Sequence, residues 1–261
     1  MGAQNGLMLY HWEPCGNSGR PLLCLAEKGL AFDSRYVDVL RFEQFAPDFL
    51  TLNPRGEVPV LLHEGASITE ASYIEQYLDE SFPGTPLMPA DAIGRWRVRA
   101  WQKHVDEEIG PFVSLLNATA LRSRMLASRT AEQLRNEVQC IPVRQRRNLW
   151  DATVSHEPTE AQAQEARRKI TAFIDDELEP ALRGQQWLAG QYSLADGAAF
   201  CFVAFLPRLL GDLVNAQRTP AVFAWLLRMR ARPAVQAMLA QAHTGDPYVL
   251  AAPGPEPVRW G

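Results

Sequence analysis

A short turn near the start of the chain places a thiol and a hydroxyl together at the beginning of a predicted helix. Cys15 and Ser18 stand three residues apart, next to the apolar helical pattern of residues 18–28. Backbone N–H groups and the helix dipole at such a position stabilise negative charge and lower the pKa of a thiol. The C-x-x-S spacing is that of a single-thiol redox motif with Cys15 as nucleophile. The structural alternative is that Ser18 only caps the helix.

A second segment, residues 53–61, joins a proline directly to an apolar strand. Pro59 cannot donate a hydrogen bond to a sheet, so it belongs at a strand start or in a turn. The segment N-P-R-G-E-V-P-V-L resembles the N-P-x-G-x-V-P-x-L motif of glutathione transferases. The resemblance implies a cis Val58–Pro59 peptide bond, which leaves the Val58 backbone free to pair with the cysteinyl unit of glutathione.

Glu70 and Ala71 stand where the family has a Glu-Ser pair at the start of a helix. The resemblance implies that backbone N–H groups there bind the γ-glutamyl carboxylate of glutathione, and that Glu70 binds its ammonium group. Ala71 lacks the usual hydroxyl donor, so weaker glutathione binding is expected. Ser72 is expected to point elsewhere, because neighbouring helical positions diverge by about 100°.

The resemblance also implies a chemical role for Ser18. Serine-using transferases place a serine in this turn to donate a hydrogen bond to the glutathione sulfur, and Asn17 is a second candidate donor. A free thiol has a pKa of about 8.5, so little of it is nucleophilic at pH 7. A hydroxyl donor and a helix N-terminus together lower that pKa by about one or two units. Cys15 as nucleophile would instead make the protein a glutathione-removing reductase.

Several stretches resemble one branch of the family, the bacterial β-etherases that cleave β-aryl ethers of lignin-derived dimers. One is Phe42-Glu43-Gln44, from which Gln44 is expected to contact glutathione. The resemblance implies thiolate attack on the carbon that bears the aryl ether, beside a ketone, with release of a phenolate. An aromatic-lined pocket suits this substrate, although core packing is the alternative for each expected residue. These residues are Trp12, Trp101, Phe112, Leu115, Leu116 and Trp150.

Two other functions stay open. One is a different glutathione enzyme, which conjugates electrophiles, removes halide or exchanges thiols through Cys15. The other is a non-catalytic, transferase-like binding module. The resemblance implies a homodimer, with glutathione as co-substrate and a hydrophobic aromatic molecule as second substrate.

The elements that must position these residues fall into two halves. Strands are expected at 7–12, 32–39, 58–63 and 66–69, and helices at 18–28 and 70–80, with Gly29 ending the first helix and Thr69 capping the second. Beyond the Pro-rich segment 81–90 the pattern is helical, with long helices at 93–121 and 159–183 and an interruption at 139–158. We expect an α+β thioredoxin-like domain at 1–86, an all-α helical domain at 91–245 and a tail at 246–261, which together make the glutathione transferase fold.

One further motif is structural. Ser193 and Asp196 form an S-x-x-D capping box that opens a buried helix, and it resembles the folding motif of the family's C-terminal domain. Gly197 stands where the family usually has a large apolar residue, so the hydrophobic staple to Tyr192 is expected to be missing.

Composition argues against several classes of function. The 261 residues are 47% hydrophobic and 21% charged, as in an ordinary globular protein, and the net charge of −4 offers no basic surface for nucleic acid. We find no signal-peptide pattern and no apolar run of the length that a membrane span needs. The four cysteines form no C-x-x-C pair and the five histidines show no metal-ligand spacing. We therefore expect a cytoplasmic protein with reduced thiols and no metal.

Overall fold

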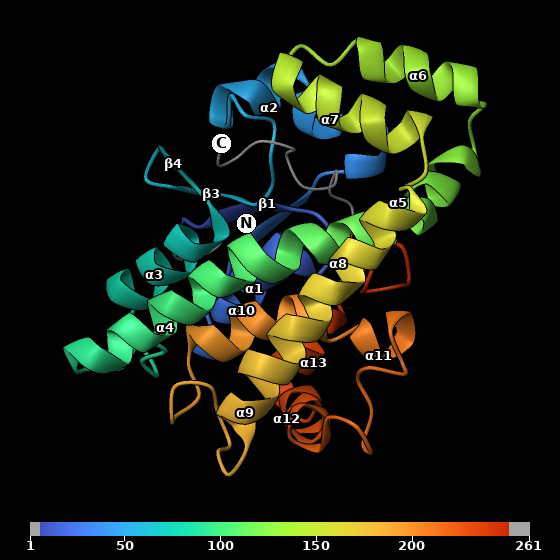
Figure 1. The fold of residues 1–261 in the computed structure, drawn as a ribbon. Coiled ribbons are helices and arrows are strands. Elements are labelled where there is room, and N and C mark those ends of the chain that lie inside the picture. Colours follow the sequence, from blue (N-terminus) through green and yellow to red (C-terminus); the bar gives the residue numbers. More distant parts are fainter. Residues whose placement is uncertain (1–5, 251–261) are drawn as a thin grey trace.

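The computed structural model describes residues 6–250, in which a small sheet packs against a large helical assembly (Figure 1). The strands are β1 Met8–His11, β2 Asp33–Tyr36, β3 Val60–His63 and β4 Ala66–Thr69, in the order β2-β1-β3-β4. β1 is parallel to β2 and antiparallel to β3, so that Leu9 lies opposite both Ser34 and Leu61. β3 and β4 are antiparallel and form a hairpin around Glu64-Gly65.

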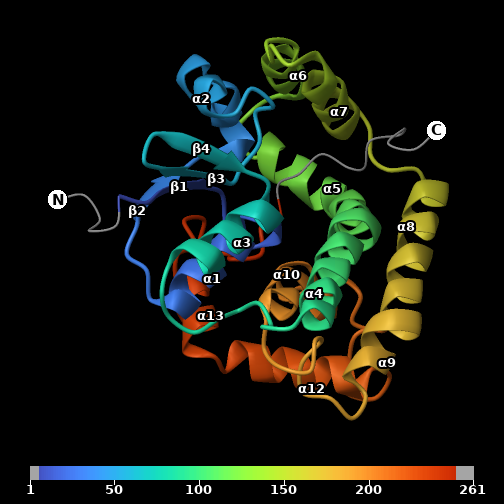
Figure 2. The ribbon, with the colours of Figure 1, turned by 90° about the vertical axis from the view of Figure 1, so that its left-hand side faces the viewer.

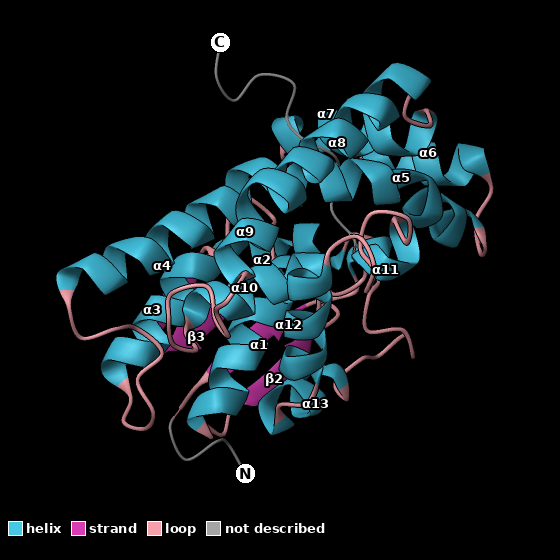
Figure 3. Ribbon diagram, turned by 60° about the horizontal axis from the view of Figure 1, so that its bottom comes forward, coloured by secondary structure: helices cyan, strands magenta, loops and turns pink. Residues whose placement is uncertain are grey.

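Helices make up most of the remaining chain (Figure 3). The first half contains α1 Gly16–Lys28, the 3₁₀ turns η1 Val39–Arg41 and η2 Glu43–Phe45, α2 Pro47–Leu52 and α3 Ala71–Ser81. The second half contains α4 Ala92–His104, the π-helical η3 Val105–Ile109, α5 Gly110–Leu126, α6 Ala131–Gln139, α7 Arg144–Ser155, α8 Glu160–Ala172, the π-helical η4 Phe173–Leu178, α9 Glu179–Leu182, α10 Leu194–Val203, α11 Leu206–Leu209, α12 Pro220–Arg230 and α13 Pro233–Leu239. The expected α+β half followed by an all-helical half is confirmed. None of the helices described in residues 6–250 has the length and apolar character that would let it cross a membrane.

The sheet is covered on both faces. α1 and α3 lie on the face toward the helical half, and α2 lies on the other side (Figure 2). α1 packs against α3, α10 and α13. One apolar core runs from Leu9 in β1 through Leu22 in α1 to Phe200 in α10. Both halves therefore fix the position of α1, the helix that carries Ser18.

Local capping signals predict some helix ends well. α1 ends as expected at Gly29, whose left-handed backbone (φ 62°) lets its N–H reach the Ala26 carbonyl. The Ser193–Asp196 capping box is present at the start of α10. The expected cap of α3 was wrong: Glu70, at φ 68°, occupies the N-cap position in place of Thr69. Thr69 is instead the last residue of β4, where it pairs with Val60.

Three longer-range expectations were also wrong. β2 stops at Tyr36, because the Asp38 carboxylate accepts a hydrogen bond from the Leu40 N–H (3.0 Å) and starts a turn. Within residues 139–158, α7 occupies 144–155, so the helical pattern breaks only in the flanking turns. Residues 246–250 of the expected tail are packed, with Val249 3% and Leu250 6% exposed. The rest of that tail, 251–261, lies outside the described residues.

Gly197 lies where α10 passes α1. A Cβ added there would lie 3.4 Å from the Leu23 side chain, an ordinary van der Waals contact, so the two helices approach closely at this position. Tyr192 packs elsewhere: its ring stands edge-on to Trp187 (5.1 Å) and lies 3.4 Å from the Arg232 guanidinium. Aromatic and cation–π contacts thus hold the start of α10 where the staple is missing.

Candidate functional site

The N-terminal end of α1 carries both predicted hydrogen-bond donors. Ser18 is 4% exposed, and its Oγ accepts a hydrogen bond from the Trp12 N–H (3.0 Å). Within residues 6–250 the Ser18 O–H has no acceptor of its own, so this proton is available to a ligand. Ser18 does not cap α1, since Cys15 occupies the N-cap position. Asn17 lies beside it and is exposed to solvent.

Cys15 sits in a different environment from that of a reactive thiol. The side chain is 3% exposed and packs into the apolar core. Burial, with the neighbouring Cys201 and Glu13 adding to it, raises the pKa of the Cys15 thiol well above its usual range. A thiol in this position stays protonated at neutral pH and is a poor nucleophile. The thiol-exchange alternative loses its support.

The Val58–Pro59 turn lies at the same end of the sheet as Ser18. The peptide bond is cis, as expected. Tyr10 pairs with Val60 across the antiparallel β1–β3 ladder, so Trp12 and Val58 both extend beyond the same end of these strands. Among the described residues, the backbone N–H and C=O of Val58 take part in no hydrogen bond. They are therefore available to an extended peptide.

Gln44 carries a buried side-chain oxygen that points to a ligand-binding role. The residue belongs to η2 and is 2% exposed, and its Oε1 is buried without a hydrogen-bond partner within the described chain. Leaving such an oxygen unpaired costs about 1–3 kcal/mol. An N–H group of a bound ligand would satisfy it. These residues thus fit a small peptide such as glutathione.

The start of α3 completes this end of the sheet. Because Val60 pairs with Thr69, Glu70 and Ala71 follow β4 at the end where Val58 precedes β3. Glu70 is bonded to Arg55, with 3.1 Å between Oε1 and Nη1, and Ala71 is the first residue of α3. Ser72 points away, as expected, and its Oγ donates to Asp106 Oδ2 (2.9 Å).

The aromatic residues expected around a second substrate separate into two groups. Trp12 and Trp150 share one apolar cluster, in which Trp150 is 2% exposed and stands edge-on to Phe42 (5.3 Å). Trp12 stacks on Tyr36 (5.2 Å), and its indole N–H donates to the Val249 carbonyl (2.7 Å). Core packing accounts for Trp150.

The second group packs against the other core. Trp101 stands edge-on to Phe173 (6.2 Å), and no hydrogen bond or ring contact within residues 6–250 joins it to Ser18 or Trp12. Trp101 is half-buried, and its contact with a substrate stays a prediction. Phe112, Leu115 and Leu116 on α5 are half-buried.

Sequence reasoning missed a buried carboxylate next to this site. Glu13 is fully buried, and it accepts hydrogen bonds from the Tyr36 hydroxyl (2.9 Å) and from the backbone N–H groups of His243 (3.1 Å) and Thr244 (2.9 Å). Burial and the Glu13 hydrogen bond raise the pKa of Tyr36. The partners of Glu13 lie up to 231 positions away, so no local pattern could have indicated them.

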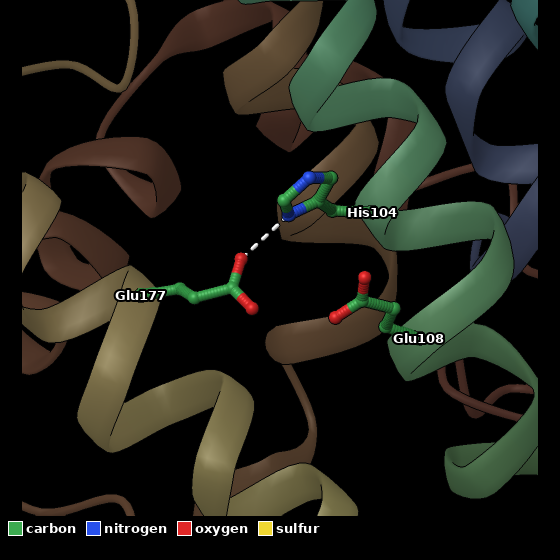
Figure 4. A group of neighbouring side chains, drawn as sticks. All are labelled: His104, Glu108 and Glu177. Carbon is green, nitrogen blue, oxygen red and sulfur yellow. Dashed lines mark hydrogen bonds and ion pairs between the residues drawn. The ribbon is translucent and has the colours of Figure 1, made fainter.

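A group of side chains with metal-ligand chemistry lies between α4–η3 and η4 (Figure 4). His104, Glu108 and Glu177 each offer one ligand atom, all within 4.8 Å of one another. His104 Nδ1 is 2.5 Å from Glu177 Oε2, an ordinary ion pair or hydrogen bond at the protein surface. Spacing among histidines and cysteines could not indicate this group, because two of its members are carboxylates.

The chain resembles known glutathione transferases along most of its length. Residues 9–86 match the glutathione S-transferase N-terminal domain, and residues 142–233 match the glutathione S-transferase C-terminal domain. Protein LigF of Sphingobium sp. strain SYK-6 is 36% identical over 250 residues, which are 92% of this chain and 95% of that protein. The crystal structure of β-etherase LigF from the same strain aligns with a TM-score of 0.85 at 35% identity, over 91% of this chain and 100% of that one. A glutathione transferase from Burkholderia graminis, solved with two glutathione molecules per subunit, aligns with a TM-score of 0.68 at 26% identity, over 91% and 88% of the two chains.

Proposed function

Because the chain belongs to the glutathione S-transferase family, we propose that it uses reduced glutathione to cleave β-aryl ether bonds in lignin-derived aromatic dimers, in the cytoplasm. The likeness to LigF, a β-etherase, extends over nearly the whole chain and supports this substrate class. The observation that carries the proposal is the Ser18 hydroxyl at the start of α1. Its oxygen is held by the Trp12 N–H, and its proton remains free to donate to a sulfur atom.

Each residue of the site has a separate task in the proposed reaction. Ser18, with Asn17 as a second donor, directs a hydrogen bond at the sulfur and lowers the pKa of its thiol. The Val58 backbone pairs with the cysteinyl unit, and the Gln44 Oε1 accepts a ligand N–H. Glu70 binds the ammonium group, and the Ala71 N–H binds the γ-glutamyl carboxylate.

Bound glutathione supplies the sulfur nucleophile. A C–S bond forms at the carbon that bears the aryl ether, the C–O bond breaks, and the phenolate leaves with the electron pair. A phenol has a pKa of about 10, so its anion leaves without a strong acid and takes its proton from solvent. Pro59 and Val58 hold the peptide, and Trp12, Trp101, Phe112 and Leu115 are the candidates for contact with the aromatic rings.

Replacement of Ser18 by alanine tests this proposal. Loss of one or two units of thiol pKa depression should lower kcat/KM for phenol release by about 10- to 100-fold at pH 7. The deficit should shrink toward pH 9, where the thiol ionises unaided. Phenol release from a racemic β-aryl ketone ether, followed by chromatography with and without glutathione, gives the rates.

Cys15→Ala is the matched control and should keep kcat/KM within about twofold, because the buried thiol takes no part. Glutathione-dependent release that is unchanged in Ser18→Ala would contradict the assignment of Ser18. No release by the unmodified protein would favour a general conjugating enzyme or a binding module.

The homodimer is part of the proposal. Three large apolar side chains on α3 and α4 are strongly exposed: Tyr73 at 67%, Ile93 at 62% and Trp96 at 65%. Exposed apolar residues of this size on neighbouring helices favour an interface, and a second copy of this chain is the occupant that the family implies. Light scattering should give twice the chain mass of 29.2 kDa, and Trp96→Glu should shift the equilibrium to monomers. A monomeric unmodified protein at about 10 μM would contradict this part.

A further inference from the structure

The helical insert made of α6 and α7 lies beside the segments assigned to glutathione binding. Figures 1 and 2 both show α6 and α7 next to α2, on the side of the sheet away from α1. Arg129, in the turn before α6, donates to the Leu40 carbonyl (2.7 Å). The insert is therefore fastened to the glutathione-binding half.

The first link between the insert and the site is a chain of alternating charges. Arg146 on α7, whose side chain is 12% exposed, forms an ion pair with the Glu57 carboxylate. Glu57 Oε2 also lies 3.3 Å from Arg55 Nε, and Arg55 Nη1 lies 3.1 Å from Glu70 Oε1. The chain thus begins on α7, passes the residue before Val58, and ends at the residue assigned to the ammonium group of glutathione.

The second link is apolar. Trp150, one turn after Arg146 on α7, stands edge-on to Phe42, and both belong to a cluster that includes Phe45. A side chain at Gly56 would overlap the Phe45 ring, so the turn before Val58 is interlocked with the segment that carries Gln44. One face of α7 therefore supports both the Gln44 segment and the Val58 segment.

We propose that Arg146 is a positioning residue for glutathione, acting through Glu57 and Arg55 on the Val58 backbone and on Glu70. This inference rests on the proposed function, because those residues are assigned to glutathione there. The ion pairs fix the turn of residues 53–57 before the ligand arrives. Binding then loses less conformational freedom, and the affinity is higher.

Arg146→Ala should raise the Kd for glutathione by about three- to tenfold, measured by calorimetry. Arg144→Ala is the matched control: Arg144 is exposed on the same helix, and its removal deletes the same charge. It should change the Kd by less than twofold. Arg146→Lys should recover part of the affinity, since lysine keeps the charge but not the planar fork. At saturating glutathione, kcat and the KM for the aryl ether should stay within twofold.

Arg146→Ala combined with Glu57→Gln tests whether Arg146 acts through Glu57. The double variant should bind glutathione no more weakly than the weaker of the two single variants. Unchanged affinity in Arg146→Ala, or an equal loss in Arg144→Ala, would overturn the proposal. Calorimetry tests this inference separately from ether cleavage. If the unmodified protein binds glutathione but releases no phenol, only the proposed reaction is contradicted. If it binds no glutathione, both the proposed reaction and the role of Arg146 are contradicted.

Discussion

Replacing Arg20 by alanine should lower the free energy of unfolding by about 3–5 kcal/mol, because it leaves a carboxylate buried without its cation. The Arg20 guanidinium is fully buried. Its Nε and Nη2 donate to Glu75 Oε2 at 3.1 and 2.9 Å, and Nη1 lies 2.5 Å from Asp106 Oδ1. Arg20 thereby joins α1, α3 and η3 through its contacts with Glu75 and Asp106. Chemical denaturation monitored by tryptophan fluorescence gives the change.

The loss should grow with pH. Burial already raises the pKa of Glu75, with Arg20 opposing that shift, so the pKa rises further when Arg20 is removed. A carboxyl whose folded pKa is raised contributes stability below its unfolded pKa and loses that contribution as pH rises through the folded value. Arg20→Ala should therefore be closer to the unmodified protein at pH 5 than at pH 8.

Two further variants test whether the loss in Arg20→Ala comes from the unpaired buried charge. Arg20→Met with Glu75→Gln removes both charges and should recover much of the loss. Arg167→Ala removes an arginine from the exposed Arg167–Asp212 pair and should cost at most about 1 kcal/mol. An Arg20→Ala loss as small as that of Arg167→Ala would show that the buried network contributes little.

Asp196→Ala should also lower the free energy of unfolding by about 3–5 kcal/mol, through unsatisfied donors in the core. Asp196 is fully buried. Its Oδ1 accepts from the Leu188 N–H (3.1 Å) and the Trp225 indole N–H (3.0 Å), and its Oδ2 accepts from the Ser193 N–H (3.1 Å). Its removal would leave all three donors buried and unpaired. The shift of the denaturation midpoint measures the loss.

Gln133→Ala is the control for Asp196→Ala. Thr130 and Gln133 form the same kind of capping box on the exposed end of α6, where water can replace the lost partner. The expected cost is about 1 kcal/mol or less. Similar losses of unfolding free energy in the two variants would mean that burial does not strengthen the contribution of the capping hydrogen bonds to stability.

The features that sequence predicted best are those set by a few neighbouring residues. The cis Val58–Pro59 turn, the Gly29 helix end and the Ser193–Asp196 box each depend on a motif shorter than ten positions, and each is present. Glu70 shows the limit of this approach. A threonine is a good cap by propensity, but pairing of Thr69 in the β4 strand overrides that preference.

The candidate site was predictable only in part, for the same reason. Residues 18, 58, 70 and 71 lie in local motifs, and sheet register places these motifs at one end of β1, β3 and β4. Arg20, Glu13 and Arg146 have no such motif, because their partners come from distant elements. Trp150 shows the opposite error: its aromatic character suggested substrate contact, but the side chain is 2% exposed and packs against Phe42.

The contacts of residues 243–250 bear on how the protein can be divided. Glu13 accepts from His243 and Thr244, Trp12 donates to Val249, and Asn117 donates to the Leu250 carbonyl (2.7 Å). The last described residues thus form part of the environment of the first strand, and an isolated fragment of residues 1–86 would lack buried partners for Glu13 and Trp12. Exchange of residues 1–86 between relatives during evolution would therefore preserve these contacts only if a matching C-terminal segment were exchanged as well.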